Sequence, residues 1–181
     1  YHNEQLKSLS RYRLSKVRER AKLKQQLARL VNILFPELEK LVPTLHISSV
    51  YALLEQFPGA SFVANAHLTK LTNLLTTASK GHYKKEKAIQ IRVLAASSVG
   101  CFMPAKSLEL KHTITLIRVL SNEIAEIESE IKKLMDESHS PITSIPGMSY
   151  RMAAMILSEI GDFSNFDSPD KILAFAGLSP S

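Results

Sequence analysis

The sequence predicts an all-α protein in which long helices form a coiled-coil stalk and carry smaller helical parts. Three observations predict this fold class. Residues 3–35 contain neither glycine nor proline, residues 104–137 keep an apolar seam at helical spacing, and no segment alternates as a β-strand does. The chain has 181 residues, of which 45% are hydrophobic and 22% are charged. These proportions are typical of a folded domain and argue against a wholly disordered chain.

A strongly basic helix is expected in residues 1–41. Apolar side chains in its second half recur at spacings of four, three and four, on one stripe of a helix: Leu23, Leu27, Leu30 and Leu34. Residues 1–30 contain nine basic and two acidic side chains, in a chain whose formal charge is +6. Such a cluster suits a polyanion, because each cation placed on a phosphate releases a counterion. The candidate nucleic-acid contacts are Arg11, Arg13, Arg18 and Arg20.

The same charges have a second interpretation, since a charged helix face is usually just a solvated surface. For this helix the sequence favours neither phosphate contact nor simple solvation over the other. Tyr12, between two of the arginines, could stack on a base. Packing of Tyr12 against the next helix is the interpretation that we favour.

A small helical unit is expected in residues 42–103, where Pro43 and Pro58-Gly59 separate short helices. Residues 104–137 then predict one long helix, with Pro104 in its first turn. Its seam alternates at spacings of three and four for more than three heptads. The seam residues are Leu110, Thr113, Ile117, Leu120, Ile124, Ile127, Ile131 and Leu134. Their partner is either the first helix, in an antiparallel pair, or residues 110–134 of a second copy, in a homo-oligomer.

Residues 138–181 differ in composition from the long helix before them and contain the most informative turn. Pro146-Gly147 directly precedes a helix, whose N-terminus offers amide groups and a positive dipole to a phosphate. Ala153 and Ala154 would let a neighbouring helix approach closely. We therefore predict a helix-hairpin-helix-like unit that holds a backbone phosphate without reading bases. Its candidate contacts are Gly147, Met148, Ser149 and Arg151. The alternative is an ordinary turn before a helix.

Several classes of site are disfavoured. Cys101 is the single cysteine, so the fold does not depend on a disulfide, which suits the cytoplasm, and we expect its side chain to be buried. No segment is apolar over the about 18 residues of a membrane span. The six histidines lack metal-ligand spacing, and Glu159 with Asp162 is more simply a solvated face and a loop cap than a metal pair. We assign no catalytic and no metal-binding residue.

The C-terminal residues resemble a transposase family. Ile145-Pro146-Gly147-Met148 is followed by the run 153–162, which ends in Glu-Ile-Gly-Asp, then by Phe166 and by the run Leu173–Pro180. This order and spacing are similar to the C-terminal domain of the insertion-sequence transposases called the IS-one-ten group, together with the Piv-type DNA invertases. The resemblance covers residues 142–181. Met148 stands where the family prefers Ile, and Phe175 where it often has Tyr.

The resemblance implies a two-part recombinase that cuts and joins DNA. An upstream RuvC-like domain would carry an acidic D-E-D-D set that binds Mg²⁺, and a serine in a Ser-Gly pair would follow the Gly-Leu-x-Pro segment. Characterised members use a structured guide RNA. The acidic set does not occur in this chain. The Ser-Gly pair is missing as well, since neither Ser179 nor Ser181 precedes a glycine. We expect an interior fragment, with an incomplete domain in residues 138–181, no cofactor of its own and no independent activity.

The expected function is DNA binding within DNA transposition or site-specific recombination. The alternative is a non-enzymatic helix-hairpin-helix adaptor for nucleic acids, which would have native termini near residues 1 and 181. A purely structural coiled-coil protein is a third possibility, but it leaves the pattern of residues 142–181 without an explanation.

Overall fold

The computed structural model describes residues 2–139 and 141–160, apart from the side chains of residues 141, 143 and 158–160. The described residues form helices joined by turns, and no strand occurs among them, which confirms the all-α prediction. The two long helices are α1 (His2–Leu34) and α6 (Pro104–Glu137). Between them lie η1 (Pro36–Leu41), α2 (Ser48–Gln56), α3 (Ala60–Ala64), α4 (Leu68–Ala78) and α5 (Lys85–Ala96). After α6 follow η2 (Pro141–Ser144) and α7 (Tyr150–Ile160).

The chain divides into two compact units. Unit 1 contains residues 1–19 and 120–181, and unit 2 contains residues 20–119. The expected segments 1–41 and 104–137 therefore each contribute to both units. Each unit has a hydrophobic core of its own.

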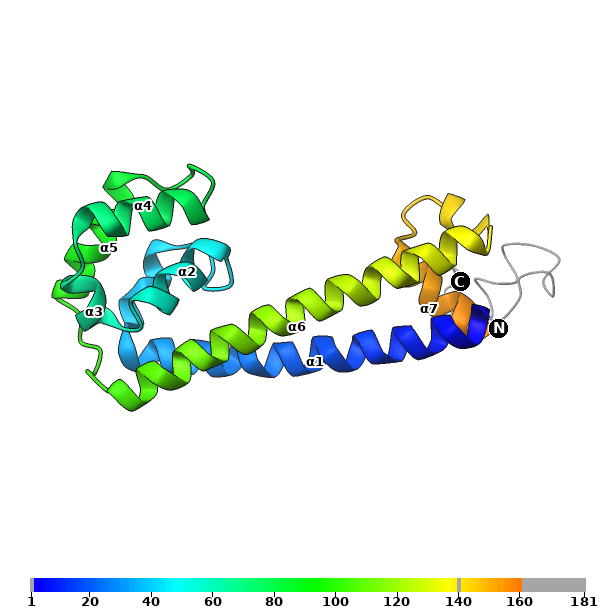
Figure 1. The fold of residues 1–181 in the computed structure, drawn as a ribbon, viewed down its shortest axis with the longest axis horizontal. Coiled ribbons are helices and arrows are strands. Elements are labelled where there is room, and N and C mark those ends of the chain that lie inside the picture. The colour runs from blue at the N-terminus through cyan, green and yellow to red at the C-terminus, as the bar shows by residue number, and fades with distance from the viewer. Residues whose placement is uncertain (1, 140, 161–181) are drawn as a thin grey trace, which may run out of the picture. The chain divides into compact units, whose positions relative to one another are not determined.

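Unit 2 has the larger core. Leu27, Leu30 and Leu34 from the second half of α1 are buried with Leu110 and Ile114 from the first half of α6. The helices run antiparallel here (Figure 1), and a hydrogen bond of 3.1 Å from Gln26 Nε2 to Glu109 Oε1 joins them. Helices α2 to α5 pack on one another beside this pair and bury further apolar side chains, Leu53 and Leu71 among them (Figure 1).

The segment between α5 and α6 is fixed to the end of α1. A side chain at Gly100 would overlap the carbonyl group of Leu34, so only glycine permits this approach. The Cys101 N–H donates to the Ile33 carbonyl oxygen at 2.8 Å. Contrary to our expectation, the Cys101 side chain is exposed. Its backbone bonds to α1 while its thiol faces solvent, which an apolar sequence context does not reveal.

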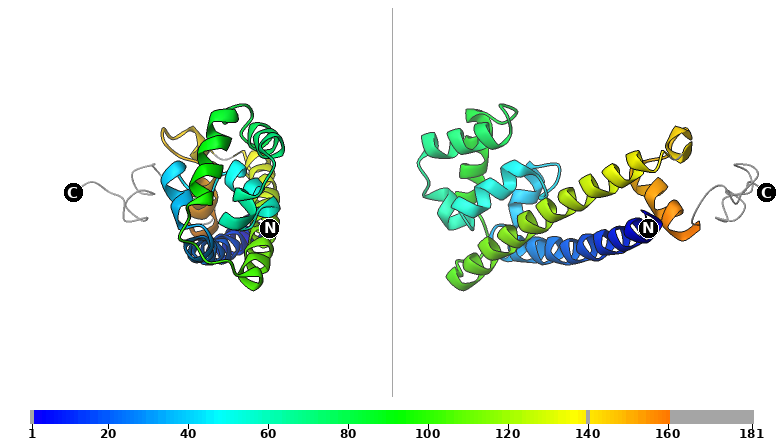
Figure 2. Two further views of the ribbon diagram at one scale, coloured as in Figure 1. Left: turned by 90° about the vertical axis from the view of Figure 1, so that its left-hand side faces the viewer. Right: turned by 45° about the vertical axis from the view of Figure 1, so that its right-hand side comes forward.

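Unit 1 is assembled from both ends of the chain. The first turns of α1 lie beside α7, and the second half of α6 packs on both (Figure 2). Leu6 is fully buried in a core with Ile127 and Ile131 of α6 and Ala153 and Ala154 of α7. Both alanines are 0% exposed, which confirms that this position of α7 is one of close approach.

The seam of α6 packs against α1 in each unit. Its members are buried, except that Leu134 is only half-buried and Met135 takes its place. A straight helix has 3.6 residues per turn, so a strict heptad pattern drifts off the packed face after several turns. The antiparallel alternative is thus the one found within the chain. Pairing of two copies through residues 110–134 stays a prediction.

Candidate nucleic-acid interface

The turn before α7 has the shape that the Pro-Gly pair predicts. Gly147 has a φ of +80°, which an L side chain rarely adopts, and among the described residues none but its chain neighbours has an atom within 4 Å of the position of a Cβ there. The Met148 N–H donates to the Ile145 carbonyl oxygen at 3.1 Å and closes the turn. Glycine is therefore needed for the backbone angle and not for space.

Ser149 is the N-cap of α7. Its Oγ accepts a hydrogen bond of 3.2 Å from the Met152 N–H, and its carbonyl oxygen accepts one of 2.9 Å from the Ala153 N–H. A serine at this position satisfies one amide of the first turn. The N–H groups of Met148 and Met152 thus already have acceptors within the protein. These two are therefore not among the amides that could donate to a phosphate.

The turn joins η2, which is a short 3-10 helix, to α7. The rest of the segment that would complete the expected helix-hairpin-helix-like unit, residues 161–181 with Asp162, lies outside the described residues, as does the side chain of Glu159. The helix-hairpin-helix form of this unit therefore stays a prediction.

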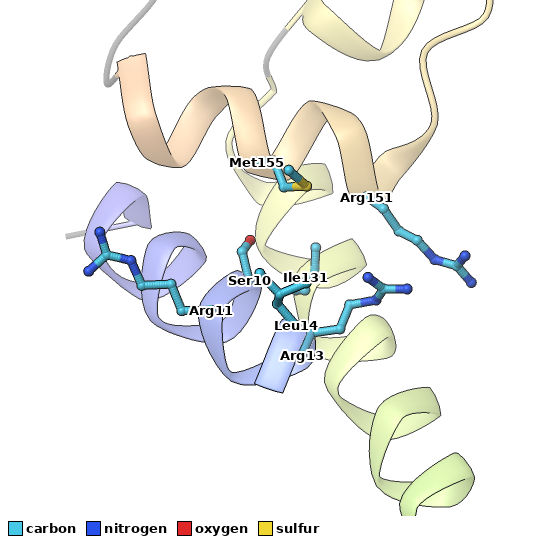
Figure 3. Close-up of a pocket in the computed structure, with 7 residues that line it drawn as sticks. All are labelled: Ser10, Arg11, Arg13, Leu14, Ile131, Arg151 and Met155. Carbon is cyan, nitrogen blue, oxygen red and sulfur yellow. The ribbon is translucent and has the colours of Figure 1, made fainter. Parts of the chain in front are cut away.

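Three of the predicted arginines meet around one pocket of unit 1. Arg11 and Arg13 come from α1, and Arg151 comes from the first turn of α7. Figure 3 shows Arg13 and Arg151 extending to the same side of the pocket, while Arg11 extends to the other. The remaining lining is mostly apolar: Leu14, Ile131, Met155 and Ser10.

Ser10 adds a polar atom to this pocket. Its Oγ is buried, and no hydrogen-bond partner for it is found within residues 2–139 and 141–160. Burial of a hydroxyl without a partner costs free energy, so such an atom is suited to an incoming hydrogen-bonding group. In Figure 3, Ser10 on α1 faces Met155 on α7.

Glu128 of α6 binds two of the three arginines. Its Oε1 accepts from Arg13 Nε at 2.8 Å and from Arg151 Nε at 2.9 Å, and its Oε2 accepts from an Arg151 terminal nitrogen at 2.9 Å. Burial alone would raise the pKa of the Glu128 carboxyl, but the hydrogen bonds and charges of both arginines lower this pKa below its ordinary value. The carboxylate is charged at neutral pH, so Glu128, Arg13 and Arg151 together carry one net positive charge.

A second ion pair lies one turn or so further along the same helices. Lys16 Nζ is 2.9 Å from Glu123 Oε2, and the same ammonium group lies over the Tyr12 ring, 5.4 Å from its centroid. Tyr12 is 50% exposed, so our expectation that it packs against the next helix is wrong. Its ring lies on the same face of α1 as Lys16.

The other predicted arginines lie apart from the pocket lining. Arg18 is exposed on α1 in unit 1. Arg20 is half-buried in unit 2, where burial and then the charge of Arg20 lower the pKa of Lys24. The sequence analysis did not predict Glu128 as a residue of this site. No local pattern in the sequence points to it, because its partner Arg13 is 115 positions away.

In the described part of the chain, no three His, Cys, Asp or Glu side chains are grouped so that they could hold a metal ion. No helix there is both long enough and apolar enough to cross a membrane.

Comparison with known proteins gives a match in the C-terminal part of the chain. A family model described as "Transposase IS116/IS110/IS902 family" matches residues 139–181. This segment contains the turn at Gly147 and supplies Arg151 to the pocket of unit 1. A comparison with curated proteins gives no match.

Proposed function

Residues 139–181 belong to the IS116/IS110/IS902 transposase family, and from this premise we propose that unit 1 binds the nucleic-acid backbone during DNA transposition. The family assigns the chain a role in transposition. The contacts are the proposal: Arg11, Arg13 and Arg151 hold phosphates, and the turn adds the backbone amides of Gly147 and Ser149.

One observation carries this proposal. The family segment and the basic helix α1, which are far apart in the sequence, place three guanidinium groups around one pocket, and two of these groups pair with the carboxylate of Glu128. Guanidinium groups are the side chains best suited to phosphate oxygens, because their planar donors match them in pairs. The net charge of the group stays positive even with Glu128 ionised.

The lining of the pocket favours backbone contact over base reading. Its remaining side chains are aliphatic or sulfur-containing, with the hydroxyl of Ser10 as the polar exception. Contacts to phosphates fix the register of a protein on nucleic acid but carry no sequence information. Target choice would then come from elsewhere, which is compatible with the guide RNA that the resemblance implies.

The chemistry of strand cleavage is a separate matter. Mg²⁺ bound by an acidic set is the expectation for full-length relatives, and it would stabilise charge on the transferring phosphoryl group. The described residues do not supply such a set. Within the chain, the proposed contribution is to bind and orient the substrate.

The test compares two variants with equal loss of charge within unit 1. Arg11→Gln with Arg151→Gln removes two proposed contacts, and Lys132→Gln with Lys133→Gln removes two exposed lysines of α6. Binding of labelled duplex DNA is measured by fluorescence anisotropy over a range of salt concentrations. We expect the slope of log K against log salt to fall by about 1.8 for the arginine variant, since each phosphate contact contributes about 0.9. Equal slopes for both variants would refute the assignment.

A further inference from the structure

Unit 2 contains a second basic groove, which the proposed function does not use. It lies between the second half of α1 and the start of α6, which run side by side in Figure 1. Lys22, Gln25, Gln26 and Arg29 of α1 line it, opposite Lys106 and Glu109 of α6. All of these residues belong to unit 2.

Three of the α1 side chains share one face. Lys22, Gln25 and Arg29 are separated by three and four residues, which places them in a row along a helix, and all three are exposed. From Lys22 to Arg29 the helix rises by about 10 Å, since an α-helix rises about 1.5 Å per residue. That length corresponds to about three nucleotides of one strand along a duplex axis.

The acidic residue of the groove is already bound within the protein. Glu109 Oε2 is 2.9 Å from Lys106 Nζ, and Glu109 Oε1 accepts the hydrogen bond from Gln26. The hydrogen bonds from Lys106 and Gln26 lower the pKa of Glu109 below its ordinary value, so it is ionised at neutral pH. In the part of the chain that the structure describes, no ion pair engages Lys22 or Arg29. The groove therefore keeps two positive charges in excess.

The lining also indicates which form of nucleic acid fits. It contains no aromatic side chain, whereas proteins that hold single strands use aromatic rings on which the bases stack. Lysine, arginine and glutamine donate to phosphate and sugar oxygens, which a duplex displays along its outside. The charge and the absence of stacking groups among the lining residues together favour a duplex backbone.

We propose that this groove is a second DNA-binding site, in which Lys22 and Arg29 contact phosphates of one duplex strand and Gln25 donates to an oxygen between them. This inference rests on the proposed function, because it assumes that the chain binds DNA. It extends that function from unit 1 to unit 2, so that the transposase segment and the central helical unit each contact the duplex.

The experiment uses the full 181-residue chain and labelled duplex DNA in a salt titration. Lys22→Gln with Arg29→Gln is compared with Lys85→Gln with Lys111→Gln, which removes two exposed lysines elsewhere in unit 2. We expect the groove variant to lower the slope of log K against log salt by about 1.8, and the control variant to keep the wild-type slope. Circular dichroism confirms that the helical content of each variant is unchanged.

The outcomes separate the two proposals. If the wild-type chain shows no salt-dependent binding of duplex DNA, the proposed function fails, and this inference fails with it. If the wild type binds, the Arg11 and Arg151 variant loses slope and the groove variant does not, only the second site is refuted. A loss that appears with single-stranded DNA or RNA but not with the duplex would also overturn it.

Discussion

Glu128→Gln tests whether one carboxylate holds α7 to the long helices of unit 1. The variant keeps the size of the side chain and removes the charge that Arg13 and Arg151 share. A hydrogen bond to a charged group contributes about 1.5–3 kcal/mol when it is shielded, whereas an exposed ion pair contributes about 0–1 kcal/mol. Arg13 is 19% exposed and Arg151 is 59% exposed, so the first pair approaches the higher range and the second the lower.

We therefore expect Glu128→Gln to lower the free energy of unfolding by about 2 kcal/mol at neutral pH. In a protein of this size each kcal/mol shifts Tm by about 2–4 °C, so Tm should fall by about 4–8 °C. Thermal unfolding followed by circular dichroism measures this shift. The control is Glu130→Gln, because Glu130 pairs with Lys133 one turn away and both side chains are more than half exposed. Its Tm should stay close to that of the wild type.

The pH dependence of the difference gives a sign to check. The folded-state pKa of Glu128 lies below its unfolded value, so its contribution to stability is complete above the unfolded pKa of about 4.3 and disappears as the pH falls through the lower, folded pKa. The Tm difference between wild type and Glu128→Gln should be constant from about pH 5 to about pH 8, because the Glu128 carboxyl is ionised throughout this range. The difference should shrink in acid. Identical melting of both variants at neutral pH, or a difference that persists in strong acid, would refute the reasoning.

We make three further predictions, for substitutions at Glu128, Gly147 and Gly100. Glu128→Gln should also tighten duplex DNA binding, since it leaves two guanidinium groups without an internal carboxylate, and anisotropy titrations would reveal an unchanged affinity if this is wrong. Gly147→Val should cost about 1–2 kcal/mol, because φ is +80° there, and should weaken DNA binding, while Gly147→Asn should retain both properties. A valine variant that folds and binds as the wild type does would contradict a role for this turn. Gly100→Ala should cost about 1–3 kcal/mol in chemical denaturation, because the added methyl group meets the Leu34 carbonyl, and an unchanged midpoint would show that the loop can move away.

Local patterns in the sequence predicted the helices well. Pro104 begins α6, and the absence of glycine and proline up to Pro36 sets the extent of α1. The turn at Pro146-Gly147 likewise precedes α7, as expected. These features depend on backbone preferences and on periodicity within a few turns, which a single sequence contains.

Tertiary partners could not be predicted in the same way. The periodicity of α6 identified its buried face but left two partners open, and tertiary contacts such as the hydrogen bond from Gln26 to Glu109 were needed to show that α1 is its partner within unit 2. Arg13 was predicted as a DNA contact from its charge, yet it pairs with a carboxylate 115 positions away. Helix-face arguments find which side is solvated, but they do not rank which acid meets which base.

The division of the chain into two units has a consequence for biosynthesis. Unit 2 is formed by one continuous stretch, residues 20–119, whereas the core of unit 1 combines Leu6 with Ala154, which is synthesised much later. Domains generally fold as units while the chain is being made, and a long loop adds only slowly to the entropy of closure. The first turns of α1 therefore lack part of their hydrophobic core until α7 has been synthesised.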